Sequence, residues 1–469
     1  MSDPLRLSLV DLTAALHGRK LSPVELMTAF FRRLDERNAE LNAVVAMFER
    51  DALLEQARAA EARIARGEGR ALEGVPLGVK DLEDCAGLVT SHGSIPYKEN
   101  LAARDSVQVA RLRAAGAIPI GKTNAPEFGY TAITKNLVFG VTRNPWNLER
   151  TPGGSSGGSS AALSACMLPL VTASDGGGST RIPACFVGAF GLKPTYGRIP
   201  SEPKSLWYYG DTAVHGPLTK TVADNALYLD ATVGYAPEDP ASLPHPGFSY
   251  AAKLAEGVPR KLRIAYSPDL GYAVVQSDIA QAVYDAARLF EKLGHSVTEI
   301  SGGPPKLGNA WGMWGAFELA AANLQHLPAR EKDFSRAVLA SMKLAWDMTP
   351  EYFREQAMGR LALSRWCQSV FSDYDLLITP TVPYDPPPAK GPFPRETEGR
   401  EQLDWGVASF TIPFNLSLHP AASLRVGLSR AGLPIGMQIV AERHRDELVL
   451  QAAAAFERER PWHDQWPVR

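Results

Sequence analysis

The stretch TPGGSSGGSSAALSACMLPLVTASDGGGSTR, residues 151–181, decides the fold. Its beginning has the composition of a flexible Gly/Ser linker. However, residues 151–174 carry no charge and are too rich in Gly, Ser and Pro to span a membrane. A linker is rarely continued by charge-free apolar chain, so we expect a helix over residues 156–166 and a strand over 168–173. The segment therefore predicts a helix–strand unit whose glycines let neighbouring backbone approach closely.

Short apolar runs alternate with helical patterns on both sides of this unit. A capping box with proline at the first helical position, Ser22-Pro23-Val24-Glu25, predicts a helix start. Strands that alternate with helices predict an α/β sheet covered on both faces. The other expected strands are residues 43–48, 74–79, 117–120, 262–266, 296–300, 375–379, 423–426 and 436–440, and the other expected helices are residues 51–66, 106–115, 277–293 and 446–457.

The overall composition is that of an ordinary globular protein. Of 469 residues, 45% are hydrophobic and 21% are charged. The net charge of -2 gives no basic field that would attract nucleic acid. The N-terminus lacks the features of a secretory signal, and the four cysteines form no CxxC pair. We therefore expect a cytoplasmic protein with free buried thiols that binds neither nucleic acid nor membrane.

Lys80 is the first candidate for chemistry, because it ends the apolar run at residues 74–79. If this run is a strand of the sheet, the lysine stem is buried. Burial disfavours the ammonium form and lowers the pKa from its ordinary value of about 10.4. A neutral lysine can act as a general base. The alternative is a lysine at a strand end whose ammonium group extends into water.

Ser179 is the second candidate, and three consecutive glycines separate it from Asp175. Consecutive glycines can turn successive N–H groups inward and form an anion-binding nest. Acyl transfer needs such donors beside the nucleophile, because the tetrahedral oxyanion must be stabilised. Asp175 and Arg181 flank this turn and could pair across it. The alternative is a tight turn at the surface.

Together these segments resemble the amidase signature family. The resemblance rests on Gly74–Asp81, on the Gly/Ser-rich stretch that contains Ser155, and on Asp175–Arg181. The second serine follows Ser155 by 24 residues, and the lysine precedes Ser155 by 75 residues. Similarity to the family covers most of the chain and is densest at 74–200 and 375–455. Four further segments also look like parts of this family: Gly121–Phe128, Phe190–Gly197, Pro413–Asn415 and Leu433–Val440.

The resemblance implies an amidase signature fold, in which a large twisted mixed β-sheet is enclosed by helices. It implies one domain over residues 1–469 with a signature core at about 74–200. It also implies a Ser-cisSer-Lys triad, with Ser179 as the nucleophile, Ser155 as the bridging serine after a cis peptide bond, and Lys80 as the base. The implied oxyanion hole consists of the N–H groups of Gly176, Gly177, Gly178 and Ser179, and the supporting positions are Gly154, Ser156, Asp175 and Arg181. The chain departs from the family at Gly176, where a bulkier residue, often Thr or Ile, usually follows the aspartate.

Such a site implies a hydrolase that cleaves amide-type C–N bonds through an acyl-enzyme on Ser179. Amides, anilides, carbamates (urethanes) and esters all present a carbonyl that it could attack. The histidines show no HExxH or paired spacing, and serine and lysine supply both nucleophile and base. We therefore expect no metal and no cofactor, and a small-molecule amide or carbamate as the binding partner. The sequence leaves open whether the chain forms a homodimer.

Two aromatic segments are candidates for the substrate pocket. One is Trp207-Tyr208-Tyr209. The other lies in a segment at about 300–370, which commonly varies in families of this kind, and it contributes Trp311, Met313 and Trp314. If both face the site, the pocket favours neutral apolar or aromatic substrates such as anilides and aryl carbamates. The alternative is that this stripe is simply hydrophobic core.

Four other interpretations compete with this one. Gly116–Thr123 fits the phosphate-loop pattern, but its middle residues are themselves an expected strand. Gly153–Gly157 fits the nucleophile elbow of an α/β-hydrolase-type esterase with Ser155 as nucleophile, but the preceding residues are polar and turn-like. A glutaminase-type subunit of a tRNA-dependent amidotransferase is the rival within the family. A non-catalytic binding module is disfavoured by the intact triad.

Overall fold

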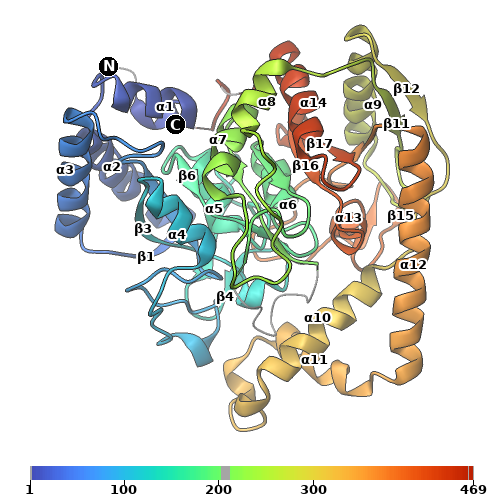
Figure 1. Ribbon diagram of the computed structural model, residues 1–469. Coiled ribbons are helices and arrows are strands. Elements are labelled where there is room, and N and C mark those ends of the chain that lie inside the picture. The colour runs from blue at the N-terminus through green and yellow to red at the C-terminus, as the bar shows by residue number, and fades with distance from the viewer. Residues whose placement is uncertain (1–2, 202–211, 463, 468–469) are drawn as a thin grey trace.

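The computed structural model describes residues 3–201, 212–462 and 464–467, and it has the mixed α/β fold that the sequence predicts. Helices pack around a long sheet, with α2 (Pro23–Leu41) near one end and α12 (Pro350–Asp373) along the other (Figure 1). The predicted capping box starts α2: Ser22 Oγ accepts hydrogen bonds from two backbone N–H groups, and the Glu25 side chain accepts one from Ser22 N–H. The described helices include none long and apolar enough to cross a membrane.

The first part of the sheet contains the strands nearest the N-terminus. Its order is β1-β3-β2-β6, in which β2 lies parallel to β3 and β6, and β1 lies antiparallel to β3. All residues of β2 and β3 are buried, which explains their continuous apolar runs. The bounds are β1 (Val44–Met47), β2 (Pro76–Lys80), β3 (Ile118–Thr123) and β6 (Leu170–Val171).

The second part of the sheet is a mixed run in the order β10-β8-β16-β17-β13-β11-β12. A short pair, β7–β9, and a hydrogen bond of 3.0 Å from Gly216 N to Ala173 O join the two parts. The joint includes Asp175, so the candidate loop starts where the two parts meet. The bounds are β7 (Ser174–Asp175), β8 (Phe190–Lys193), β9 (Val214–His215), β10 (Leu218–Thr219), β11 (Arg263–Tyr266), β12 (Ser296–Glu299), β13 (Leu376–Pro380), β16 (Ala421–Leu428) and β17 (Pro434–Ala441).

Two short helices at the centre carry the serine segments at their N-termini. Every residue of α5 (Gly157–Ser164) and α6 (Arg181–Val187) is buried. The helix α5 can pack so closely because it begins with glycines: a Cβ on Gly158 would lie 2.2 Å from the backbone nitrogen of Asn124. The predicted helix at 156–166 is thus confirmed, and the Gly/Ser stretch is buried structure rather than a linker.

The segment at about 300–370 forms three helices beside the main body (Figure 1). They are α10 (Gly308–Ala322), α11 (Arg336–Leu344) and α12. The helices α10 and α11 bury a small core of their own, which includes Leu319, Val338 and Met342 together with Phe128. The stripe residues Trp311, Met313 and Trp314 are not part of this small core, and Trp314 is 36% exposed.

The remaining elements complete the cover of the sheet. The expected helices at 51–66, 106–115, 277–293 and 446–457 and all the expected strands are present, with ends shifted by a few residues. The other bounds are α1 (Leu9–His17), α3 (Arg50–Ala65), α4 (Val107–Ala114), β4 (Lys135–Asn136), β5 (Gly140–Val141), α7 (Val222–Thr232), α8 (Tyr250–Glu256), α9 (Ser277–Lys292), β14 (Glu396–Thr397), β15 (Arg400–Glu401), α13 (Ile412–Leu416) and α14 (Asp446–Glu459).

Candidate active site

Lys80 lies at the end of β2, and its side chain is fully buried. Its Nζ donates hydrogen bonds of 2.8 Å to the hydroxyl oxygens of Ser155, Ser156 and Ser174, and one of 3.3 Å to the carbonyl oxygen of Ser174. The lysine therefore does not extend into water, and the snorkelling alternative is wrong.

The surroundings of Lys80 change its acidity. Burial lowers the pKa of Lys80 to about 7, while the charges of Glu83 and Asp175 partly oppose that shift. No carboxylate among the described residues forms an ion pair with the amine, so its partners are neutral hydroxyl and carbonyl oxygens. At neutral pH a large fraction of this side chain is consequently an uncharged amine, the form that can accept a proton.

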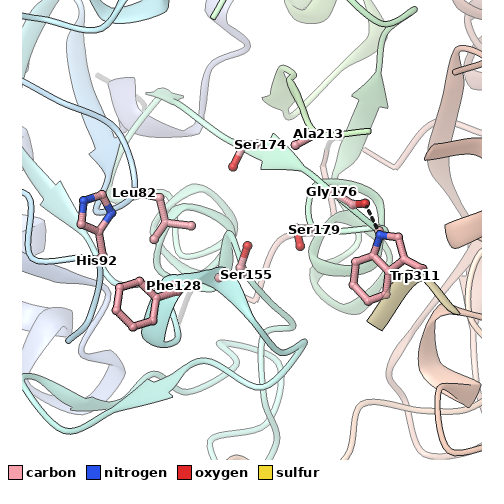
Figure 2. A pocket seen from close by; sticks show the side chains of 11 residues that line it. Leu82, His92, Phe128, Ser155, Ser174, Gly176, Ser179, Ala213 and Trp311 are labelled. Carbon is pink, nitrogen blue, oxygen red and sulfur yellow. Dashed lines mark hydrogen bonds between the residues drawn. The ribbon is translucent and has the colours of Figure 1, made fainter. Parts of the chain in front are cut away.

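Ser155 follows the cis peptide bond Gly154–Ser155 that the resemblance implied. The adjoining backbone is tightly enclosed: a Cβ on Gly154 would lie 2.6 Å from the carbonyl oxygen of Thr131. Ser155 and Ser179 line the same pocket (Figure 2). Their hydroxyl groups form no hydrogen bond with each other in this structure, although both residues are described. Such bonds are commonly long without substrate and tighten in the complex.

Asp175 and Arg181 form a fully buried ion pair, as their flanking positions suggested. Arg181 Nη2 lies 2.9 Å from Asp175 Oδ1, and Nε lies 3.0 Å from Oδ2. Burial alone would raise the pKa of Asp175, but the Arg181 charge and its hydrogen bonds outweigh that effect and hold the pKa well below its usual range. Arg181 also bonds Thr411, Asn415 and Gln438, so the pair ties the loop to α13 and β17.

The glycine loop between Asp175 and Ser179 is held from both sides. Gly178 N–H donates a 2.7 Å hydrogen bond to Asp175 Oδ1, and Gly178 is absent from the described lining of the pocket. This N–H is therefore engaged with the carboxylate and is not available to a substrate. The N–H groups of Gly176, Gly177 and Ser179 donate to no described residue, and these three residues line the pocket.

A pocket lies in front of the two serines. None of its described lining residues is Asp, Glu, Lys or Arg. Burial lowers the pKa of His92 to about 4, and the Lys122 charge adds to the shift, so the imidazole is neutral at pH 7. The lining residues are Leu82, His92, Phe128, Gly129, Ser155, Ser174, Gly176, Gly177, Ser179, Ala213 and Trp311.

The predicted aromatic wall residues lie in different places. Trp311 lines the serine pocket, and its indole N–H donates a 2.8 Å hydrogen bond to Gly176 O (Figure 2). Trp314 lines a neighbouring, mainly apolar pocket between α10 and α12, which Trp311 and Arg360 also line. Met313 is half-buried and lines neither of these two pockets. Trp207, Tyr208 and Tyr209 lie outside the described residues.

Sequence reasoning missed the opposite wall, which His92 and Phe128 form. Their rings stack with centroids 6.3 Å apart, and both residues have left-handed backbone conformations with φ of 52° and 51°. Both residues lie in loops, and local sequence patterns do not predict where these loops lie relative to the pocket. Ser174 was also missed, although its position directly before Asp175 at the end of an expected strand was a signal.

Two rival interpretations do not fit the local structure. Lys122 lies within β3 and is buried, and its Nζ donates to Glu83 O and Thr90 Oγ1, so it does not belong to a phosphate loop. Residues 151–156 contain no strand, whereas a nucleophile elbow needs a strand directly before its serine. In the part of the chain that the structure describes, no group of three or more His, Cys, Asp or Glu residues could hold a metal ion.

Known proteins are similar to this chain over nearly its whole length. The family model for amidases matches residues 25–450. The chain belongs to the amidase signature family. An acylamidase of Rhodococcus erythropolis is 38% identical over 473 residues, which cover 98% of this chain and 97% of that protein. The crystal structure of a bacterial aryl acylamidase from the amidase signature family matches with a TM-score of 0.92 at 31% identity, covering 98% of this chain and 97% of that one.

A third relative is named for a different function. It is a glutamyl-tRNA(Gln) amidotransferase subunit of Geobacter sp. strain M21, which is 34% identical over 483 residues, covering 97% of this chain and 98% of that protein. Membership of the family and the similarity to acylamidases show that this chain is a hydrolase of amide C–N bonds.

Proposed function

We propose that this amidase cleaves its substrates through Ser179 as nucleophile, with Ser155 as proton relay and Lys80 as base. The observation that carries the proposal is the buried Lys80 amine bonded to three serine hydroxyls. A neutral amine has two N–H bonds and one lone pair. It can therefore donate to Ser156 and Ser174 while its lone pair accepts the hydroxyl proton of Ser155.

The cycle begins with a proton relay. Ser155 takes the proton of Ser179 as Lys80 takes that of Ser155, and Ser179 Oγ attacks the carbonyl carbon. The N–H groups of Gly176, Gly177 and Ser179 stabilise the oxyanion. The proton returns through Ser155 to the leaving nitrogen, and the C–N bond breaks. Water then attacks the acyl-enzyme with the same relay, which releases the acid and restores Ser179.

We propose neutral apolar or aromatic amides, anilides above all, as the preferred substrates. The described pocket wall offers the rings of Phe128 and Trp311 and the neutral His92, but no charged partner. An aromatic substituent gains about 2 kcal/mol from burial there, which corresponds to about thirtyfold in kcat/KM if it is realised in the transition state. A charged amide such as glutamine would lose hydration without an ion-pair partner among these residues. Aryl carbamates and esters present the same carbonyl and are proposed as further substrates.

The amidotransferase-subunit function is the second candidate, because the Geobacter subunit is 34% identical to this chain. The acylamidase is more similar, at 38% identity, and the uncharged pocket wall gives no support to glutamine as substrate. We therefore favour a free-standing acylamidase-like enzyme.

The test is to compare kcat/KM of the isolated protein for 4-nitroacetanilide, an aryl carbamate, acetamide and glutamine. We expect the anilide to exceed acetamide by at least about tenfold, from the burial argument above. Ser179→Ala should abolish all of these activities. A clear preference for glutamine or acetamide would refute the apolar-pocket proposal and favour the amidotransferase function.

We also propose a cytoplasmic location. Cys85, Cys166, Cys185 and Cys367 are all free and buried, and free thiols suit a reducing compartment. Localisation of a tagged full-length chain by cell fractionation tests this, and recovery outside the cytoplasm would contradict it.

A further inference from the structure

Trp311 makes a specific contact with the glycine loop. Its indole Nε1–H donates a 2.8 Å hydrogen bond to the carbonyl oxygen of Gly176 (Figure 2). Its ring also packs on the next residue: a Cβ on Gly177 would lie 2.3 Å from Trp311 Cζ2. One side chain from α10, in the segment at about 300–370, thus holds the Gly176–Gly177 peptide both by a hydrogen bond and by close packing.

This hydrogen bond fixes the direction of a backbone donor. The Gly176–Gly177 peptide is not among the three cis bonds of the described chain, so its C=O and N–H groups point in opposite directions. When the carbonyl oxygen points to the indole nitrogen, the Gly177 N–H points away from it. That N–H donates to no described residue, and Gly177 lines the pocket beside Ser179.

The next peptide in the loop, Gly177–Gly178, is held by hydrogen bonds at both its carbonyl and its N–H group. Thr411 Oγ1 donates a 2.6 Å hydrogen bond to Gly177 O, and Gly178 N–H donates to Asp175 Oδ1 at 2.7 Å. The Gly176–Gly177 peptide has one such restraint, the indole, and its N–H remains for a ligand. Glycine is the most flexible residue, and three glycines follow one another here, from Gly176 to Gly178. The loop therefore depends on an external contact to keep this donor in place.

We propose that Trp311 is a positioning residue for the oxyanion hole, which holds the Gly177 N–H toward the reacting carbonyl oxygen. This inference rests on the proposed function, since it assumes an oxyanion formed by attack of Ser179. Through this contact the position of α10 affects the rate of the chemical step. Trp311 also forms part of the wall of the substrate pocket.

The first test separates positioning from substrate contact. Trp311→Phe keeps a ring on Gly177 but removes the N–H donor. With acetamide, which is too small to gain much from the indole face, we expect kcat to fall about tenfold or more while KM changes by less than about twofold. A trifluoromethyl ketone, which forms a tetrahedral adduct on the nucleophile, should lose affinity by the same factor as kcat/KM. Trp346→Phe, in the same segment but 60% exposed, is the matched control and should change neither.

The second test restricts the glycine loop by a substitution within the loop itself. Gly176 does not have a left-handed φ, so threonine causes no backbone strain there. In the Trp311→Phe background, Gly176→Thr should recover part of the lost kcat, because a β-branched residue restricts the loop. Unchanged kcat in Trp311→Phe would overturn the inference. Ser179→Ala separates failure of the proposed function from failure of this inference. If Ser179→Ala remains active, the proposed function fails. If Ser179→Ala is inactive while Trp311→Phe is fully active, only the inference about Trp311 fails.

Discussion

The activity of this enzyme should fall as the pH drops below 7, because Lys80 must be neutral to act as base. Burial lowers the pKa of Lys80 to about 7, so the amine is protonated below that value and uncharged above it. About nine tenths of Lys80 is neutral at pH 8 and about one tenth at pH 6. We therefore expect kcat/KM to be about tenfold lower at pH 6 than at pH 8, with a plateau above.

The assay is the hydrolysis of 4-nitroacetanilide in overlapping buffers at constant ionic strength, since this substrate does not titrate in the range. Burial also lowers the pKa of Lys193 to about 7, but its Nζ bonds only Pro194 O among described residues. Lys193→Met is therefore the control, and its profile should keep the same inflection. Thermal unfolding at each pH shows that the fold is intact. A flat profile between pH 6 and 8, or an inflection above pH 9, would refute the role of Lys80 as neutral base.

Three further predictions concern the supporting parts of the site. Arg181→Met should lower the free energy of unfolding by about 3–5 kcal/mol, because it leaves the Asp175 carboxylate buried without its partner; a loss below about 1 kcal/mol in urea denaturation would contradict this. Ser155→Ala should retain more activity than Lys80→Ala, because water in the space of the hydroxyl can bridge the relay; the reverse order of kcat would count against it. Prolonged EDTA treatment and dialysis should leave kcat unchanged, whereas a loss restored by zinc would be incompatible with the mechanism.

Much of the fold follows from the sequence because local patterns fix its elements. The capping box at Ser22 starts α2, and the apolar run at 74–79 becomes β2 with Lys80 at its end. The charge-free stretch after residue 151 becomes α5 and β6, because only small or apolar residues fit between closely packed layers. The resemblance to the family implied that Lys80, Ser155 and Ser179 belong to one site, and the structure brings Ser155 and Ser179 to one pocket with Lys80 bonded to Ser155.

The rest depends on contacts between segments that are far apart in sequence. His92 and Phe128 meet across two loops, and nothing in either local pattern predicts that their rings stack at the pocket. The stripe on α10 points in several directions, so Trp311 lines both the serine pocket and its neighbour, while Trp314 lines the neighbour alone. The resemblance implied four equivalent N–H donors for the oxyanion in the glycine loop. In the structure, however, the N–H of Gly178 donates to Asp175. The roles of Trp207, Tyr208 and Tyr209 stay predictions.

The identity of the nucleophile is the central claim, and covalent labelling tests it most directly. A fluorophosphonate probe reacts with an activated serine, and peptide mapping by mass spectrometry locates the adduct. Our account predicts one adduct, on Ser179, formed much more slowly in Lys80→Ala because the relay lacks its base. An adduct on Ser155 with Ser179 unmodified would contradict the account.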